Sequence, residues 1–120
     1  MKHRLELTKT EHFITLFAMK RYRRFLSRSE SLKGIIPYFN LAFNRVEGSY
    51  SPEVDGGEMI SIVKALRYRA DECLKVGRYE DQDFLLELSN RIDEDRQRYQ
   101  YENGPKIENA ASARTLTAAV

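Results

Sequence analysis

The sequence predicts an all-α fold: a small single-domain helical bundle of about four helices, built on an antiparallel αα-hairpin over residues 58–102. Apolar residues recur at helical spacing along most of the chain, which indicates amphipathic helices. Only three prolines and six glycines occur, and they gather at a few breaks. With 120 residues and an apolar content of 42%, the chain suits one globular domain. We place this domain at residues 1–103 and expect a C-terminal tail over residues 104–120, either flexible or docked on a partner.

The first helix is predicted from a capping signal. Residues 2–7 alternate weakly between apolar and polar, which fits either a short N-terminal extended segment or a plain lead-in. Thr8 and Glu11 then match a capping box, in which each side chain accepts a hydrogen bond from the other residue's backbone N–H. We therefore expect a helix that runs from there to about Ser27.

The apolar side of this first helix changes along its length. Four apolar residues share one face of its first half: Phe13, Ile14, Leu16 and Phe17. In its second half the same face carries Lys20, Arg21, Arg24 and Arg28. At about 100° per residue, this arrangement predicts either a bend near Met19 or a helix that is buried on opposite sides at its two ends.

A short aromatic helix is predicted next. Pro37 suits the first turn of a helix, and apolar residues follow at i, i+3, i+4 and i+7 spacing: Phe39, Ala42, Phe43 and Val46. This spacing indicates a helix that faces the core. Gly48 is expected to end it in a left-handed conformation, and residues 49–57 are expected to form a turn-rich loop.

The two helices of the hairpin carry the most regular pattern in the chain. The third helix places one apolar stripe toward the core: Met59, Ile62, Val63, Leu66, Ala70 and Cys73. Gly77 is expected to end that helix. The fourth helix opens with acidic residues, which favour the positive end of the helix dipole. Its predicted buried residues are Phe84, Leu85, Leu88 and Ile92.

The turn between these helices resembles a known family. Residues 74–81, Leu-Lys-Val-Gly-Arg-Tyr-Glu-Asp, are similar to the inter-helix turn of a tetratricopeptide repeat, with the small residues Ala70 and Ser89 where the helices of that family approach closely. The sequence departs from the family at Gln82, and it has no second copy at a period of about 34 residues. The resemblance implies a tight antiparallel helical hairpin and a role in protein binding rather than catalysis.

Composition argues against several kinds of site. Cys73 is the only cysteine, so neither an intramolecular disulfide nor a cysteine-based zinc site is expected. The acidic residues of the fourth helix lack the Glu-x-x-His pairs of di-metal bundles, and no glycine-rich phosphate loop occurs. His12 and Cys73 lie at positions that suit packing. We therefore expect no catalytic residues, no metal and no cofactor, and we expect that the protein is not an enzyme.

The sequence also predicts the cellular compartment of the protein. The apolar run at residues 13–19 is too short, and too closely flanked by charged residues, to be a signal peptide or a membrane span. A cytoplasmic protein with no membrane contact is the expectation that follows.

Charge is divided unevenly along the chain. Residues 1–50 carry ten Lys and Arg against four Asp and Glu, a net charge of +6, whereas residues 51–120 carry ten against fourteen, a net charge of −4. The basic half contains a dense run at the end of the first helix, which we call the basic stripe: Lys20, Arg21, Tyr22, Arg23, Arg24 and Arg28. Guanidinium groups at this density suit phosphates or clustered carboxylates.

The basic stripe has three interpretations. It pairs with the acidic fourth helix of the same chain or is simply solvated, it binds an acidic surface of a larger protein, or it binds nucleic acid. Opposite-signed halves also permit a homo-oligomer. The expected function is a non-catalytic interaction module that docks on and modulates a larger protein, by compositional analogy with small phage- or mobile-element-type inhibitors of host machinery. The alternative is a nucleic-acid-binding regulator that uses the same stripe.

Overall fold

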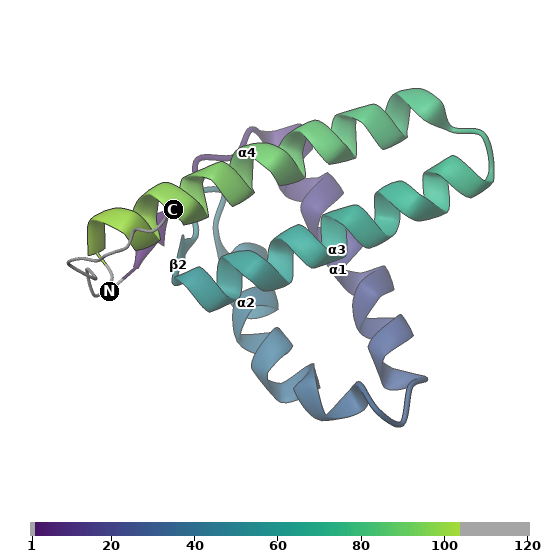
Figure 1. Ribbon diagram of the computed structural model, residues 1–120, viewed down its shortest axis with the longest axis horizontal. Coiled ribbons are helices and arrows are strands. Elements are labelled where there is room, and N and C mark those ends of the chain that lie inside the picture. The colour runs from purple at the N-terminus through teal and green to yellow at the C-terminus, as the bar shows by residue number, and fades with distance from the viewer. Residues whose placement is uncertain (1, 104–120) are drawn as a thin grey trace, which may run out of the picture.

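The computed structural model describes residues 2–103, which form four α-helices, one 3₁₀ turn and a two-stranded sheet (Figure 1). In chain order these are β1 (His3–Arg4), α1 (Lys9–Ser27), η1 (Lys33–Ile35), α2 (Ile36–Gly48), β2 (Glu53–Val54), α3 (Gly56–Lys75) and α4 (Tyr79–Asn103). The predicted all-α class is confirmed. The predicted tail at residues 104–120 lies outside the described residues.

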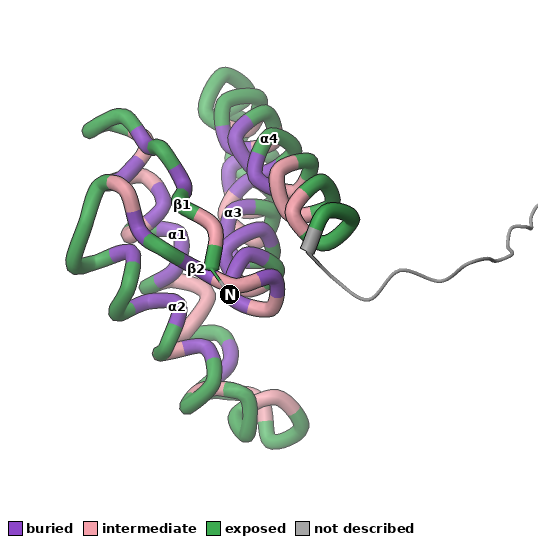
Figure 2. The backbone as a smooth tube through the Cα atoms, turned by 90° about the vertical axis from the view of Figure 1, so that its left-hand side faces the viewer, coloured by how far each residue is buried: buried purple, intermediate pink, exposed green. Residues whose placement is uncertain are grey.

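Helix α3 lies at the centre of the bundle. Its predicted apolar stripe is buried throughout, together with Ala65. Helix α4 runs antiparallel along one side of α3, while α1 and α2 pack against it from another side (Figure 1). Figure 2 shows the result as two helical pairs, α1 with α2 and α3 with α4, whose buried residues face each other.

Helix α1 begins as predicted but buries a different face. Both capping-box bonds are present, because the Glu11 N–H donates to Thr8 Oγ1 (3.1 Å) and the Thr8 N–H donates to Glu11 Oε1 (2.9 Å). One face is buried along the whole helix: His12, Thr15, Ala18, Met19 and Leu26. The prediction of a bend or of burial on opposite sides is therefore wrong. At about 100° per residue these five positions fall within about one-third of the helix circumference, so a single face packs on the core and Phe13 and Phe17 lie off it.

Helix α2 matches its prediction except at its end. Its four spaced apolar residues are buried, so it is the core-facing helix that the spacing indicated. Gly48 is the last helical residue, and the chain leaves the helix through an extended Ser49 (φ −161°, ψ 147°). Among the glycines of residues 2–103, only Gly77 has a positive φ, so the left-handed stop expected at Gly48 is wrong.

The N-terminal segment is extended rather than a plain lead-in. Strand β1 pairs antiparallel with β2, with His3 opposite Val54. Beyond the strand, the Leu5 N–H donates to the Pro52 carbonyl (2.9 Å) and the Leu7 N–H donates to the Tyr50 carbonyl (3.2 Å). Both leucines are buried, so the segment closes one end of the bundle.

The start of α3 contains a second capping box, which was not predicted from the sequence. Asp55 Oδ1 accepts from the Glu58 N–H (2.7 Å), and Glu58 Oε1 accepts from the Asp55 N–H (2.9 Å). Only 2% of Glu58 is exposed, and its second carboxylate oxygen accepts from Arg45 Nε of α2 (2.8 Å). The Asp-x-x-Glu spacing was the available signal, since Asp is among the preferred N-cap residues.

Gly77 ends α3 as predicted. Its φ is +79°, its N–H donates to the Leu74 carbonyl (3.1 Å), and the Arg78 N–H donates to the Cys73 carbonyl (2.8 Å). This pair of bonds is the Schellman motif. It satisfies two carbonyls at the helix end and reverses the chain within four residues, so that α4 begins at Tyr79.

We predict that Gly77→Ala lowers the free energy of unfolding by about 1 kcal/mol, because an L residue is disfavoured at this positive φ. Gly34→Ala is a matched control: an added Cβ meets no atom within 4 Å at either position, but Gly34 has no positive φ. Chemical denaturation measures both. Equal effects of the two substitutions would contradict a conformational role for Gly77.

Candidate protein-interaction surface

The structure divides the basic stripe into two groups. Arg21 belongs to the first group, because its side chain is held by Glu72 of α3 through two hydrogen bonds (Nε to Oε1 2.7 Å, Nη2 to Oε2 2.8 Å). The bond from Arg21, with a further one from Arg69, lowers the pKa of the Glu72 carboxyl below its ordinary value. The interpretation that the stripe pairs with α4 is therefore wrong for Arg21, since the carboxylate lies on α3.

Two further members of the stripe are also packed against the protein. Arg23 donates to Asn40 Oδ1 of α2 (3.1 Å), and its guanidinium lies 4.3 Å from the centre of the Phe43 ring. Tyr22 is part of an aromatic cluster with Phe25, Phe39 and Tyr68, with ring centroids 5.5–6.0 Å from its own. These contacts join α1 to α2 and α3.

The second group stands free on the outer face of α1. Lys20, Arg24 and Arg28 are exposed, and among residues 2–103 their side chains have no ion-pair or hydrogen-bond partner. Because they are spaced four residues apart, they lie along one face over about 12 Å of helix. We call these three residues the cationic row. Lys20 and Arg24 also line a shallow hollow of about 440 Å³ between α1 and α2.

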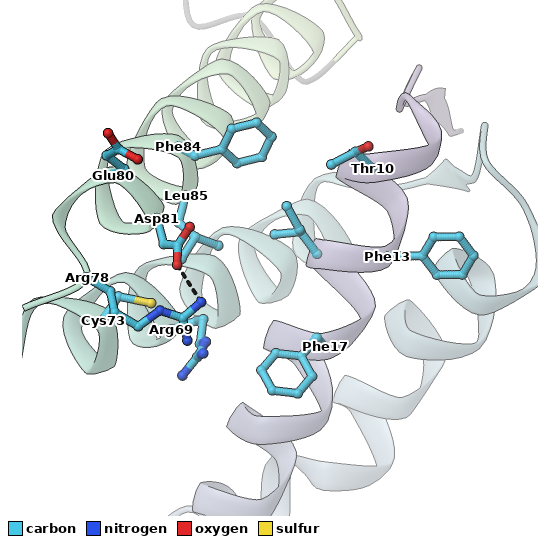
Figure 3. A pocket seen from close by; sticks show the side chains of 11 residues that line it. Thr10, Phe13, Phe17, Arg69, Cys73, Arg78, Glu80, Asp81, Phe84 and Leu85 are labelled. Atoms are coloured by element: carbon cyan, nitrogen blue, oxygen red, sulfur yellow. Dashed lines mark ion pairs between the residues drawn. The ribbon is translucent and has the colours of Figure 1, made fainter. Parts of the chain in front are cut away.

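An apolar groove of about 660 Å³ lies between α1 and the start of α4 (Figure 3). Ile14 and Phe17 line it from α1, Phe84 and Leu85 line it from α4, and Cys73 of α3 lies at its base. Phe17 is 48% exposed and Phe84 is 37% exposed, whereas Leu85 and Cys73 are buried. We call this feature the apolar groove.

Three phenylalanines that line the apolar groove were expected on the apolar, core-facing sides of their helices. Phe84 was predicted to be buried with its neighbours, but only Leu85, Leu88 and Ile92 are. Phe13 and Phe17 were placed on the apolar face of the first helix, and both are about half exposed. These expectations are wrong because hydrophobic periodicity does not reveal which face of a helix finds a partner. One signal of their exposure was present in the sequence: the helix face that carries Phe13 and Phe17 continues into charged residues, as an exposed face does.

Charged side chains at the rim of the apolar groove are already paired. Arg69 lies 4.9 Å from the centre of the Phe17 ring and donates to Glu72 (3.3 Å). Arg78 forms an ion pair with Asp81 (Figure 3). The cationic row begins three residues after Phe17 on the same face of α1 and supplies unpaired cations beyond this end of the groove.

Three acidic residues of α4 are unpaired in the described part of the chain. Arg91, four residues after Glu87, binds Glu11 at the start of α1 instead (2.8 Å). In the described part of the chain, Asp83, Glu87 and Glu94 have no ion-pair partner. Within residues 2–103 no group of three His, Cys, Asp or Glu side chains is placed to hold a metal ion.

Two residues with reactive side chains, His12 and Cys73, lie in packed surroundings. His12 is buried, with its ring edge-on to Phe13 (5.1 Å) and Tyr50 (4.5 Å). Cys73 is a free thiol that is 1% exposed, on the buried stripe where the sequence analysis placed it. A buried cysteine in such a position packs as a small apolar side chain.

Comparisons with protein-family models, with curated proteins and with solved structures found no match to this chain. The tight antiparallel hairpin implied by the tetratricopeptide-repeat resemblance is observed in α3 and α4. Of the helices described, none combines the length and apolar character needed to cross a membrane.

We predict that Glu72→Gln lowers the free energy of unfolding by roughly 1 kcal/mol at pH 7, because it removes a charge-assisted pair with Arg21. The native pKa of Glu72 is lowered, so the stabilisation is present above the ordinary Glu pKa of about 4.3. It is lost as the pH falls through the native pKa. The difference between the two proteins should therefore shrink in strong acid, as measured by urea denaturation at several pH values.

Glu87→Gln is the matched control, since Glu87 is exposed and has no ion-pair partner among the described residues. It should leave the stability unchanged at every pH. If Glu72→Gln lowers the free energy of unfolding by the same amount at pH 7 and in strong acid, the ionic role of this carboxylate is contradicted.

Proposed function

We propose that this protein is a non-catalytic interaction module that docks on a larger cytoplasmic protein through the cationic row and modulates that protein. One observation carries the proposal. Arg24 and Arg28 lack a partner among residues 2–103. Every other arginine in that range donates to a carboxylate or amide side chain: Arg4, Arg21, Arg23, Arg45, Arg67, Arg69, Arg78, Arg91, Arg96 and Arg98.

The position of the cationic row supports an acidic protein partner. Arg21 and Arg23 fix the helix beneath the row, so the three cations project from a surface that is rigid before binding. A clustered row of one sign attracts an oppositely charged surface and raises the association rate. Exposed ion pairs contribute only about 0.2–1 kcal/mol each. The row therefore supplies steering and specificity, and apolar contacts nearby are needed for affinity.

Modulation of host machinery, in the manner of small phage- or mobile-element-type inhibitors, is the form of this function that we propose. Its support is the uneven charge of the chain and a basic surface whose cations have no partner among residues 2–103. Nucleic-acid binding by the same cationic row is the second candidate, since guanidinium groups also suit phosphates.

We predict that Arg24→Glu/Arg28→Glu weakens binding to the protein partner by roughly tenfold or more, because like charges would then face each other across the interface. The measurement is affinity purification of tagged protein from its native host, followed by titration of the captured and purified partner at two salt concentrations. Lys9→Glu/Lys64→Glu is the matched control, with the same change in net charge at exposed sites outside the row.

Capture of the same partner by both double variants with equal affinity would contradict the proposed site. Capture of no protein by the unaltered chain would contradict the proposed function. If a single-stranded or duplex oligonucleotide binds instead, with a salt dependence that flattens in Arg24→Glu/Arg28→Glu, the cationic row is a nucleic-acid site.

A further inference from the structure

The apolar groove is a concave surface that the cationic row does not explain. We propose that it receives the apolar face of an amphipathic helix of the partner, whose carboxylates lie on the cationic row. This inference rests on the proposed function and specifies the partner's binding element. The partner helix has apolar residues on one face of its first turns and acidic residues on the same face of the following turns.

The size and exposure of the groove suit such a ligand. Its volume of about 660 Å³ is that of a pocket for a drug-sized molecule, roughly 300–1,000 Å³, which is room for a few apolar side chains of a helix. Phe17 and Phe84 stand on opposite walls, and each leaves more than a third of its surface exposed. Exposed aromatic residues gathered at one concave site are typical of protein-binding surfaces.

The walls of the groove are held in place without a ligand. Arg91 on α4 donates two hydrogen bonds to Glu11 on the first turn of α1 (2.8 and 3.0 Å), which ties the two walls together. Both helices also pack on α3. A binding site that is already ordered loses less entropy when its ligand arrives.

The groove and the cationic row are parts of one surface. Phe17, Lys20 and Arg24 follow one another at i, i+3 and i+7, so they share a face of α1. From Phe17 to Arg28 the helix rises about 16 Å, which corresponds to about three turns. A partner helix that lies along α1 in the same chain direction reaches the groove with its first turns and the row with its last. This arrangement is the helix-in-groove mode of recognition.

The charges around the groove favour a peptide over nucleic acid. Arg69 and Arg78 at the rim are already paired with Glu72 and Asp81. Glu80 lines the same groove, so a phosphate backbone entering it would meet carboxylates rather than free cations. An apolar side chain needs no counter-charge there.

The test uses a synthetic helical peptide as a probe. The peptide, of about sixteen residues or roughly four turns, is held helical by a hydrocarbon staple. It carries three leucines on one face of its first two turns and three glutamates on the same face of its last two. A stapled peptide of the same composition in scrambled order is the control. Fluorescence anisotropy measures binding of each labelled peptide to the full chain.

We expect saturable one-to-one binding of the patterned peptide, and binding of the scrambled peptide that is at least roughly tenfold weaker. Phe17→Ala/Phe84→Ala should weaken binding of the patterned peptide by roughly tenfold or more, because buried aromatic anchors carry much of the energy of such interfaces. Leu41→Ala/Ile60→Ala, which truncates two exposed apolar residues elsewhere, should leave it unchanged. Circular dichroism checks that both double variants are folded.

Amide chemical shifts of the unaltered protein give a second readout that needs no variant. On adding the patterned peptide, the largest changes should occur at Phe17, Lys20, Phe84 and Leu85. The proposal is overturned if the patterned peptide does not bind saturably, if the scrambled peptide binds equally well, or if the shifts lie elsewhere. It is also overturned if Phe17→Ala/Phe84→Ala instead dissociates a dimer in sedimentation, since the groove would then bind a second copy.

Failure of this inference is distinguishable from failure of the proposed function. If the captured partner is lost from Arg24→Glu/Arg28→Glu but binds Phe17→Ala/Phe84→Ala with full affinity, the groove is not its site and the docking role of the cationic row stands. If a single-stranded oligonucleotide binds in a manner that depends on Phe17 and Phe84, the groove stacks bases and the peptide proposal is overturned.

Discussion

The structure depends on the burial of one broad face of α3. That face spans nearly half of the helix circumference, from Met59 to Cys73, and no single neighbour covers it. Helix α4 covers part of it through the tight turn at Gly77, and α1 and α2 cover the rest. Because α1 and α4 each pack on α3, they remain separate walls beyond the contact between Glu11 and Arg91. The apolar groove is the space that this packing leaves open.

Two carboxylates of α3 bind arginines of the neighbouring helices and thereby hold the bundle together. Glu58 in its first turn binds Arg45 of α2, and Glu72 in its last turns binds Arg21 of α1. An ion pair at each end of α3 fixes where its neighbouring helices sit. Arginines that take part are unavailable to a partner. The cationic row consists of three exposed basic residues at the end of α1 that meet no carboxylate among residues 2–103.

The surface that remains combines two kinds of contact that serve different purposes. The apolar groove offers aromatic area whose burial is favourable in any direction of approach. The cationic row adds charge, which selects an acidic partner and fixes its orientation along α1. Exposed ion pairs contribute little binding energy, and apolar contacts do little to fix the orientation of a ligand. The two parts together are therefore suited to an amphipathic acidic helix. Binding such a helix requires neither a reactive side chain nor a metal site.

The sequence by itself determined the all-α class, the capping box at Thr8, the buried stripe of α3 and the turn at Gly77. These follow from local spacing and backbone preference, which act over one or two helical turns. The tertiary structure alone decided which face of α1 is buried, whether Phe84 is exposed and which basic residues are free. Periodicity shows that a face is apolar but not that a neighbour covers it. Likewise, a run of arginines has the same local pattern whether or not Glu72, fifty-one residues from Arg21 in the chain, lies beside it in the fold.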